Sequence, residues 1–114
     1  ISFVKVASYT DTESSGKITE VIGLNEDITG REVVIVEDIV DTGKTMERML
    51  KVLWEKSPAN IHISTLLLKP GKLQVALNIK YAAMEIPNDF IVGYGLDYDQ
   101  QGRNLRDIYT LVQE

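Results

Sequence analysis

The chain has 114 residues, enough for one hydrophobic core but not for two, so we expect a single domain over residues 1–114. Apolar residues make up 44% and charged residues 25% of the chain, and its net charge of −5 argues against a general nucleic-acid-binding surface, which must be basic. The absence of cysteine excludes disulfides and thiolate metal sites, and no apolar run approaches the ~18–20 residues that span a bilayer, so we expect a cytoplasmic protein without a membrane partner.

The first predicted element is a strand-like apolar stretch over residues 1–6, which begins at Ile1 itself. Natural termini are usually polar and loosely held, so we expect that residues preceding Ile1 are absent from this chain. The stretch over residues 9–16 is small, polar and rich in turn-forming residues, which predicts a mobile loop.

A βαβ unit is predicted next. Residues 33–36 are a continuous β-branched run, typical of a strand buried on both faces, and a polar turn over residues 38–43 follows them. Residues 61–68 form a second apolar run, which ends at Pro70 and Gly71. Between the two runs, apolar residues recur at the helical spacing i, i+3, i+4 and i+7: Met46, Met49, Leu50 and Leu53.

This order of elements predicts the α/β class, with a mostly parallel sheet flanked by helices. Further strand candidates lie at residues 81–84, 90–94 and 108–112. Ligands of such sheets bind at the carboxyl ends of the strands, so the polar turns after Val36 and Leu68 are where we expect the site.

The turn over residues 37–45 has the composition of a phosphate cradle. Residues 42–45 offer backbone N–H groups, two hydroxyls and an ammonium at a helix start, and Gly43 permits a close approach of the ligand. The Gly-Lys-Thr ending does not make a P-loop, because that motif requires glycine where Asp38 stands. Glu37 and Asp38 could accept hydrogen bonds from a ribose diol or hold magnesium, and Asp41 suits proton transfer. The alternative is an acidic turn that only caps the helix.

The whole string, with four apolar residues, two acids, two apolar residues and Asp-Thr-Gly-x-Thr, resembles the phosphoribosyl-pyrophosphate motif of type I phosphoribosyltransferases. The resemblance implies that family's fold with its N-terminal portion absent, and magnesium as cofactor. The residues implied to bind the phosphoribosyl group are Glu37, Asp38, Asp41, Thr42, Gly43, Lys44 and Thr45.

A second cluster over residues 85–98 resembles the base-binding segment of the hypoxanthine-guanine branch, with an aromatic residue before an aliphatic one and then Gly-Tyr-x-x-Asp-Tyr. The resemblance implies that Phe90 stacks on the purine and that the Ile91 backbone reads the purine edge. It also places Asp97 near a magnesium-bound water, as a metal candidate with Glu37 and Asp38. For each single residue a duller alternative stays open: a core aromatic for Phe90 and a self-bonded loop residue for Asp97.

Lys69 matches the family lysine that donates to the purine 6-oxo group. An ammonium suits a carbonyl and would meet the amino group of adenine donor to donor, although a lone lysine in a turn is usually solvated. Arg103 matches an arginine on the pyrophosphate side, and Lys72 stands where the family tends to have arginine. Ser8 and Tyr9 resemble the pair that closes a mobile lid over the reacting centre.

The resemblance therefore implies an enzyme of purine salvage, which joins hypoxanthine or guanine to phosphoribosyl pyrophosphate, as a homodimer or homotetramer. The residues implied in catalysis are Asp41, Lys69, Ser8 and Tyr9. The main alternative is a nucleotide-binding regulatory protein on the same fold, without catalysis. It should carry a basic RNA-binding face, which the charge of −5 disfavours. An adenine or orotate enzyme is disfavoured by Lys69 and by the spacing of Phe90 and Asp97. A domain serving only in an oligomer interface is the third alternative.

Overall fold

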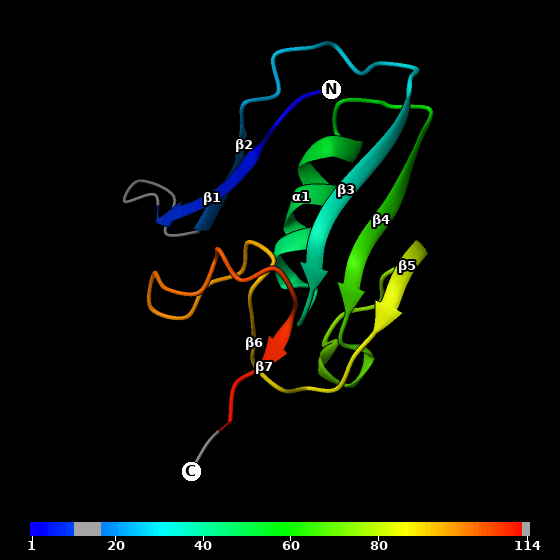
Figure 1. The fold of residues 1–114 in the computed structure, drawn as a ribbon. Coiled ribbons are helices and arrows are strands. Elements are labelled where there is room, and N and C mark those ends of the chain that lie inside the picture. The colour runs from blue at the N-terminus through cyan, green and yellow to red at the C-terminus, as the bar shows by residue number, and fades with distance from the viewer. Residues whose placement is uncertain (11–16, 113–114) are drawn as a thin grey trace.

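The computed structural model describes residues 1–10 and 17–112, and a three-stranded parallel sheet forms its centre (Figure 1). The strands are β3 (Glu32–Val40), β4 (Asn60–Leu68) and β5 (Ile79–Glu85), in the order β3-β4-β5. Both β3 and β5 pair with β4 in parallel, as the strand–helix–strand pattern predicts. The expected α/β class with a parallel sheet is confirmed.

The predicted helix is α1 (Lys44–Trp54), which connects β3 to β4. Its buried side chains are Met46, Met49 and Leu53, three of the four residues that the helical spacing singled out. These side chains share one hydrophobic core with Ile35 of β3 and Ile63 of β4. The core therefore lies between α1 and one face of the sheet.

The other face of β3 is open, which corrects the expectation of a strand buried on both sides. Val34 is 58% and Val36 is 81% exposed, whereas Ile35 between them is buried. The physical reason is that α1 is the single α-helix in residues 1–10 and 17–112, and it covers only the face that carries Ile35. A β-branched run predicts a strand, but burial of both faces of that strand also requires a second layer of structure on the other side of the sheet.

The strand β3 also runs further than expected, so the polar turn begins at Asp41 and not at Asp38. Ile39 pairs with Leu67 and Val40 with Leu68, which keeps Glu37 and Asp38 inside the parallel ladder. Val40 is buried in the core, and this burial favours extension of the strand past the two acids.

Two small antiparallel pairs complete the fold. β1 (Lys5–Thr10) and β2 (Lys17–Ile22) form a hairpin, whose Val6 and Val21 pack against the core. β6 (Ile91–Val92) pairs with β7 (Tyr109–Thr110). In Figure 1 this C-terminal segment lies toward the arrowheads of β3, β4 and β5, at the carboxyl end of the sheet.

The later strand predictions hold in position, although β6 and β7 are shorter than the stretches expected at residues 90–94 and 108–112. No helix among the described residues has the length and apolar character that a bilayer crossing requires. Trp54 and Met84 are about half exposed, so they lie outside the core that the buried methionines of α1 join.

Candidate functional site

The turn between β3 and α1 carries the residues that were predicted to form a phosphate cradle, and the name cradle is kept for this turn. Gly43 is the N-cap of α1 and has a φ of 84°, in the left-handed region that favours glycine. The Lys44 backbone N–H donates to Thr42 Oγ1 at 3.4 Å, and the Glu47 N–H donates to the Gly43 carbonyl at 2.9 Å. The backbone thus presents the positive end of α1 at the carboxyl end of β3, where an anion is favoured.

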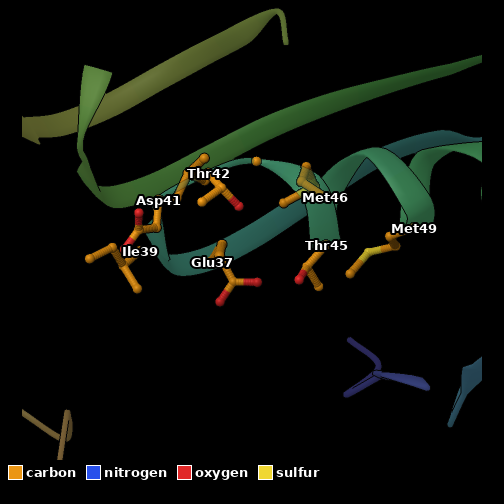
Figure 2. Close-up of a pocket in the computed structure, with 9 residues that line it drawn as sticks. Glu37, Ile39, Asp41, Thr42, Thr45, Met46 and Met49 are labelled. Carbon is orange, nitrogen blue, oxygen red and sulfur yellow. The ribbon is translucent and has the colours of Figure 1, made fainter. Parts of the chain in front are cut away.

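A cavity of about 120 Å³ opens beside this turn (Figure 2). In Figure 2 the Glu37 carboxylate and the Thr45 side chain point to the same side, one from the strand and the other from the first turn of α1. The cavity is lined by Glu37, Ile39, Val40, Asp41, Thr42, Gly43, Thr45, Met46 and Met49. Five of the seven predicted phosphoribosyl-binding residues therefore meet at one cavity.

The acidic pair has one half-buried member and one exposed member. The pKa of Glu37 is raised from 4.5 to about 7, first by burial and then by the hydrogen bond and the charge of the Asp38 side chain, whereas the hydrogen bond from the Asp38 backbone lowers it. The Asp38 N–H donates to Glu37 Oε1 at 3.1 Å, and the Ile39 N–H donates to Asp38 Oδ1 at 2.7 Å. The site therefore holds a carboxyl that resists ionisation.

This pKa leads to a prediction about stability. The folded state holds the Glu37 proton more tightly than the unfolded chain, so its contribution is fully present below about pH 4.5 and is lost as the pH rises through 7. Glu37→Gln should therefore stabilise the chain relative to wild type at pH 8 by on the order of 1 kcal/mol, since a half-buried group is partly screened, and much less at pH 5. Urea unfolding at the two pH values measures this difference. The exposed Glu85→Gln is the control, and an equal effect of Glu37→Gln at both pH values would contradict the assignment.

Asp41 lies between two lysines. Lys69 Nζ donates to Asp41 Oδ2 at 3.3 Å, and Lys72 Nζ lies 3.7 Å from Asp41 Oδ1. Lys69 is only 3% exposed, so its interpretation as a solvated turn residue is wrong. The strand register explains why Asp41 and Lys69 lie together. Val40 pairs with Leu68, and Asp41 and Lys69 are the residues that directly follow these two strand ends.

Residues 73–77, between β4 and β5, contact the cradle at Thr42 and Gly43, a contact that the sequence patterns did not predict. The Gln74 N–H donates to the Thr42 carbonyl at 2.9 Å. A Cβ at Gly43 would lie 2.9 Å from both Leu77 Cδ1 and Val75 Cγ2, so the glycine also permits this contact. The signal was the alternation Leu73, Val75, Leu77, which puts apolar side chains on one side of an extended segment.

The purine-binding candidates come from the segment after β5. Phe90 is 49% exposed and meets Tyr98 edge-to-face, with ring centroids 5.8 Å apart and an interplanar angle of 78°. The core-aromatic alternative for Phe90 is therefore wrong. Ile91 is buried and starts β6, and the Ile86 N–H donates to the Leu68 carbonyl at 2.8 Å, which fixes this segment to the residue before Lys69.

Asp97 and Arg103 pair with each other. Asp97 Oδ2 accepts a hydrogen bond from the Gln100 N–H at 2.9 Å and lies 3.5 Å from an Arg103 guanidinium nitrogen. Asp97 is thus engaged within its own loop, as the duller alternative had it. Residues 1–10 and 17–112 hold no group of three or more acidic, histidine or cysteine side chains arranged for a metal, so Asp97 does not join Glu37 and Asp38 in one cluster.

Ser8 and Tyr9 lie in β1, where their backbones pair with Thr19 and Ile18. The arrangement of their side chains, and residues 11–16 of the predicted loop, lie outside what the structure describes. The lid function of this pair therefore stays a prediction.

Comparison with known proteins agrees with this geometry. The family model described as a phosphoribosyl transferase domain matches residues 1–99. The hypoxanthine-guanine phosphoribosyltransferase of Mycobacterium bovis is 44% identical over 110 residues, which are 96% of this chain and 54% of that protein. The hypoxanthine phosphoribosyltransferase of Haemophilus influenzae is 42% identical over 117 residues, which cover 100% of this chain and 64% of that protein.

Solved structures give the same result for the fold. A hypoxanthine phosphoribosyltransferase from Staphylococcus aureus superposes with a TM-score of 0.83 at 37% identity, over 97% of this chain and 61% of that one. An enzyme from Leishmania tarentolae, described as HGPRT-ase in complex with GMP, superposes with a TM-score of 0.74 at 34% identity, over 79% of this chain and 53% of that one. The chain spans between 54% and 64% of the length of the two curated relatives named above. With its sheet, its cradle and these matches, the chain belongs to the phosphoribosyltransferase family.

Proposed function

We propose that this domain, residues 1–114, serves an enzyme that transfers the phosphoribosyl group of phosphoribosyl pyrophosphate to hypoxanthine or guanine, giving IMP or GMP and pyrophosphate. The observation that carries the proposal is the junction of the two strand ends, where a left-handed Gly43 opens α1 and the buried Lys69 meets Asp41. A phosphate site and a base-reading ammonium thereby lie at the same edge of the sheet. The names of the relatives support this choice of substrates.

The cradle supplies orientation. Thr42, Thr45 and the N–H groups at the start of α1 would hold the 5-phosphate, with Lys44 adding a cation. A phosphate held here puts the ribose over the cavity that Glu37 lines. Carboxylates at that place stabilise positive charge that develops at the anomeric carbon as the pyrophosphate leaves.

The base is selected by the groups around Lys69. Its ammonium donates to a 6-oxo group and is repelled by a 6-amino group, which favours hypoxanthine and guanine over adenine. The exposed ring of Phe90 offers a stacking surface, and the Ile91 backbone lies beside it. Asp41 would accept the proton from the five-membered ring of the purine.

Glu37 and Asp38 fit a magnesium ion whose remaining ligands would come from the substrate and from water. Magnesium usually takes one or two carboxylates together with phosphate oxygens and waters, and the strand offers Glu37 and Asp38 side by side. Burial, and after it the neighbouring Asp38 side chain, raises the pKa of Glu37, and a bound cation would favour its ionised form. When bound, magnesium would neutralise charge on the leaving pyrophosphate. In this proposal Asp97 would contact the magnesium ion through a bound water, and Arg103 would contact the pyrophosphate.

The regulatory alternative would keep the cradle without the catalysis, and the net charge of −5 disfavours the basic RNA-binding face that it requires. Location in the cytoplasm and assembly into a homodimer or homotetramer stay predictions. The same holds for the lid that Ser8 and Tyr9 would form.

Calorimetric titration of the chain with GMP, IMP and AMP in the presence of magnesium tests the proposal. We expect binding of GMP and IMP and much weaker binding of AMP. Thr45→Ala should lower the affinity for GMP about 10-fold, because it removes a hydroxyl from the phosphate cradle. Thr29→Ala, whose hydroxyl bonds to Asp27 in an exposed turn, is the control and should bind as wild type does. A folded chain that binds all three nucleotides equally, or none, would overturn the proposed function.

A further inference from the structure

The Asp41 carboxylate faces two ammonium groups, one at each oxygen. Lys69 Nζ lies 3.3 Å from Oδ2 and Lys72 Nζ lies 3.7 Å from Oδ1. Asp41 Oδ1 is buried and accepts no hydrogen bond from the described residues, so the charge of Lys72 is what faces this oxygen. Lys69 is buried, whereas the Lys72 side chain is 42% exposed.

The backbone holds Lys72 over the site by a short 3₁₀ turn, η1 (Pro70–Lys72). The Lys72 N–H donates to the Lys69 carbonyl at 3.0 Å, which folds the chain back on itself directly after β4. Gly71 in the middle of the turn lies so near Asn88 that a Cβ would be 2.8 Å from Asn88 Oδ1. The backbone position of Lys72 is therefore fixed by local structure, and its side chain reaches Asp41 Oδ1 through the ammonium group.

The proposed function gives Lys69 two competing tasks. Its ammonium now bonds to Asp41, but reading the purine requires it to turn toward a 6-oxo group. A partly buried carboxylate that loses its only cation carries a large desolvation cost. This cost would weaken base binding unless a second cation stays on Asp41.

We propose that Lys72 is a positioning residue that keeps Asp41 compensated and in place while Lys69 engages the base. The inference rests on the proposed function and adds a division of labour between the two lysines: Lys69 moves to the ligand and Lys72 stays on the carboxylate. Lys72 then acts on base binding without touching the base.

Calorimetry with two ligands tests this role. Lys72→Met keeps the aliphatic stem and removes the charge, so the affinity for GMP should fall about 2- to 5-fold, the range of a partly exposed ion pair. The affinity for ribose 5-phosphate, which has no base, should stay as in wild type. Lys72→Arg should restore GMP binding, and Lys56→Met, at an exposed lysine after α1, is the matched control without effect.

A double-mutant cycle separates positioning from direct ligand contact. In an Asp41→Asn background there is no carboxylate charge to hold, so Lys72→Met should cause no further loss of GMP affinity. An undiminished loss in that background, or an equal loss for ribose 5-phosphate, would overturn the positioning role, because Lys72 would then act on the ligand itself. A wild-type chain with no preference for GMP over AMP would instead overturn the proposed function, and the role of Lys72 with it.

Discussion

Replacing Lys69 with methionine is expected to lower the affinity for GMP about 100-fold, while the affinity for AMP stays level or rises. The reason is that a buried ammonium donating to a carbonyl contributes on the order of 1.5–3 kcal/mol, and it opposes an amino group at the same place. Methionine fills a similar volume without a charge. Titration calorimetry of the variant with both nucleotides gives the two affinities directly.

The variant separates base reading from support of Asp41. An equal loss for GMP and AMP would contradict base reading and would mean that Lys69 acts only through its 3.3 Å bond to Asp41. Lys56→Met serves as the control for removal of one positive charge, and circular dichroism of each variant checks that the fold is intact. A loss confined to GMP identifies Lys69 as the selecting residue.

Replacing Gly43 with alanine is expected to lower the free energy of unfolding by about 3 kcal/mol. A left-handed residue with a Cβ costs roughly 1–2 kcal/mol, and here the Cβ would also lie 2.9 Å from Leu77 and from Val75. Overpacking of this kind adds roughly 1–3 kcal/mol. Urea unfolding followed by circular dichroism measures the change.

Gly30→Ala is the matched control for this change. Gly30 has a φ of 71°, close to that of Gly43, but a Cβ there meets nothing within 4 Å. Its loss of stability should thus be the left-handed cost alone, roughly 1–2 kcal/mol. Equal losses in the two variants would show that residues 73–77 yield to the added methyl and do not support the cradle.

The sequence predicted the elements that rest on periodicity. The spacing of Met46, Met49 and Leu53 defines the buried side of α1, and the apolar runs mark β3 and β4. These signals succeed because each depends on residues near one another in the chain. The error at Val34 and Val36 is of another kind, since burial of a strand face depends on whether a second layer covers it.

The candidate site divides in the same way. A motif of contiguous residues places the cradle, and the structure gathers five of its residues at one cavity. The two lysines on Asp41 and the Gln74 bond to Thr42 could not be predicted, because they join residues about 30 positions apart through strand pairing. Asp97 and Arg103 were named by resemblance, and their mutual ion pair is a contact that a motif does not specify.

The pairing of Val40 with Leu68 means that the chemistry of this protein depends on strand alignment. Successive side chains of a strand point to opposite faces, so a slip of β4 by one residue would carry Lys69 about 3.3 Å along the sheet and turn it away from Asp41. Burial alternates along β4, where Ile63 is buried and its neighbours His62 and Ser64 are only partly buried, and this alternation opposes such a slip. Core residues far from the ligand thus set the distance between Asp41, the proposed proton acceptor, and Lys69, which is proposed to select the purine. A core substitution that loosens β4 would therefore lower nucleotide specificity before it unfolded the chain.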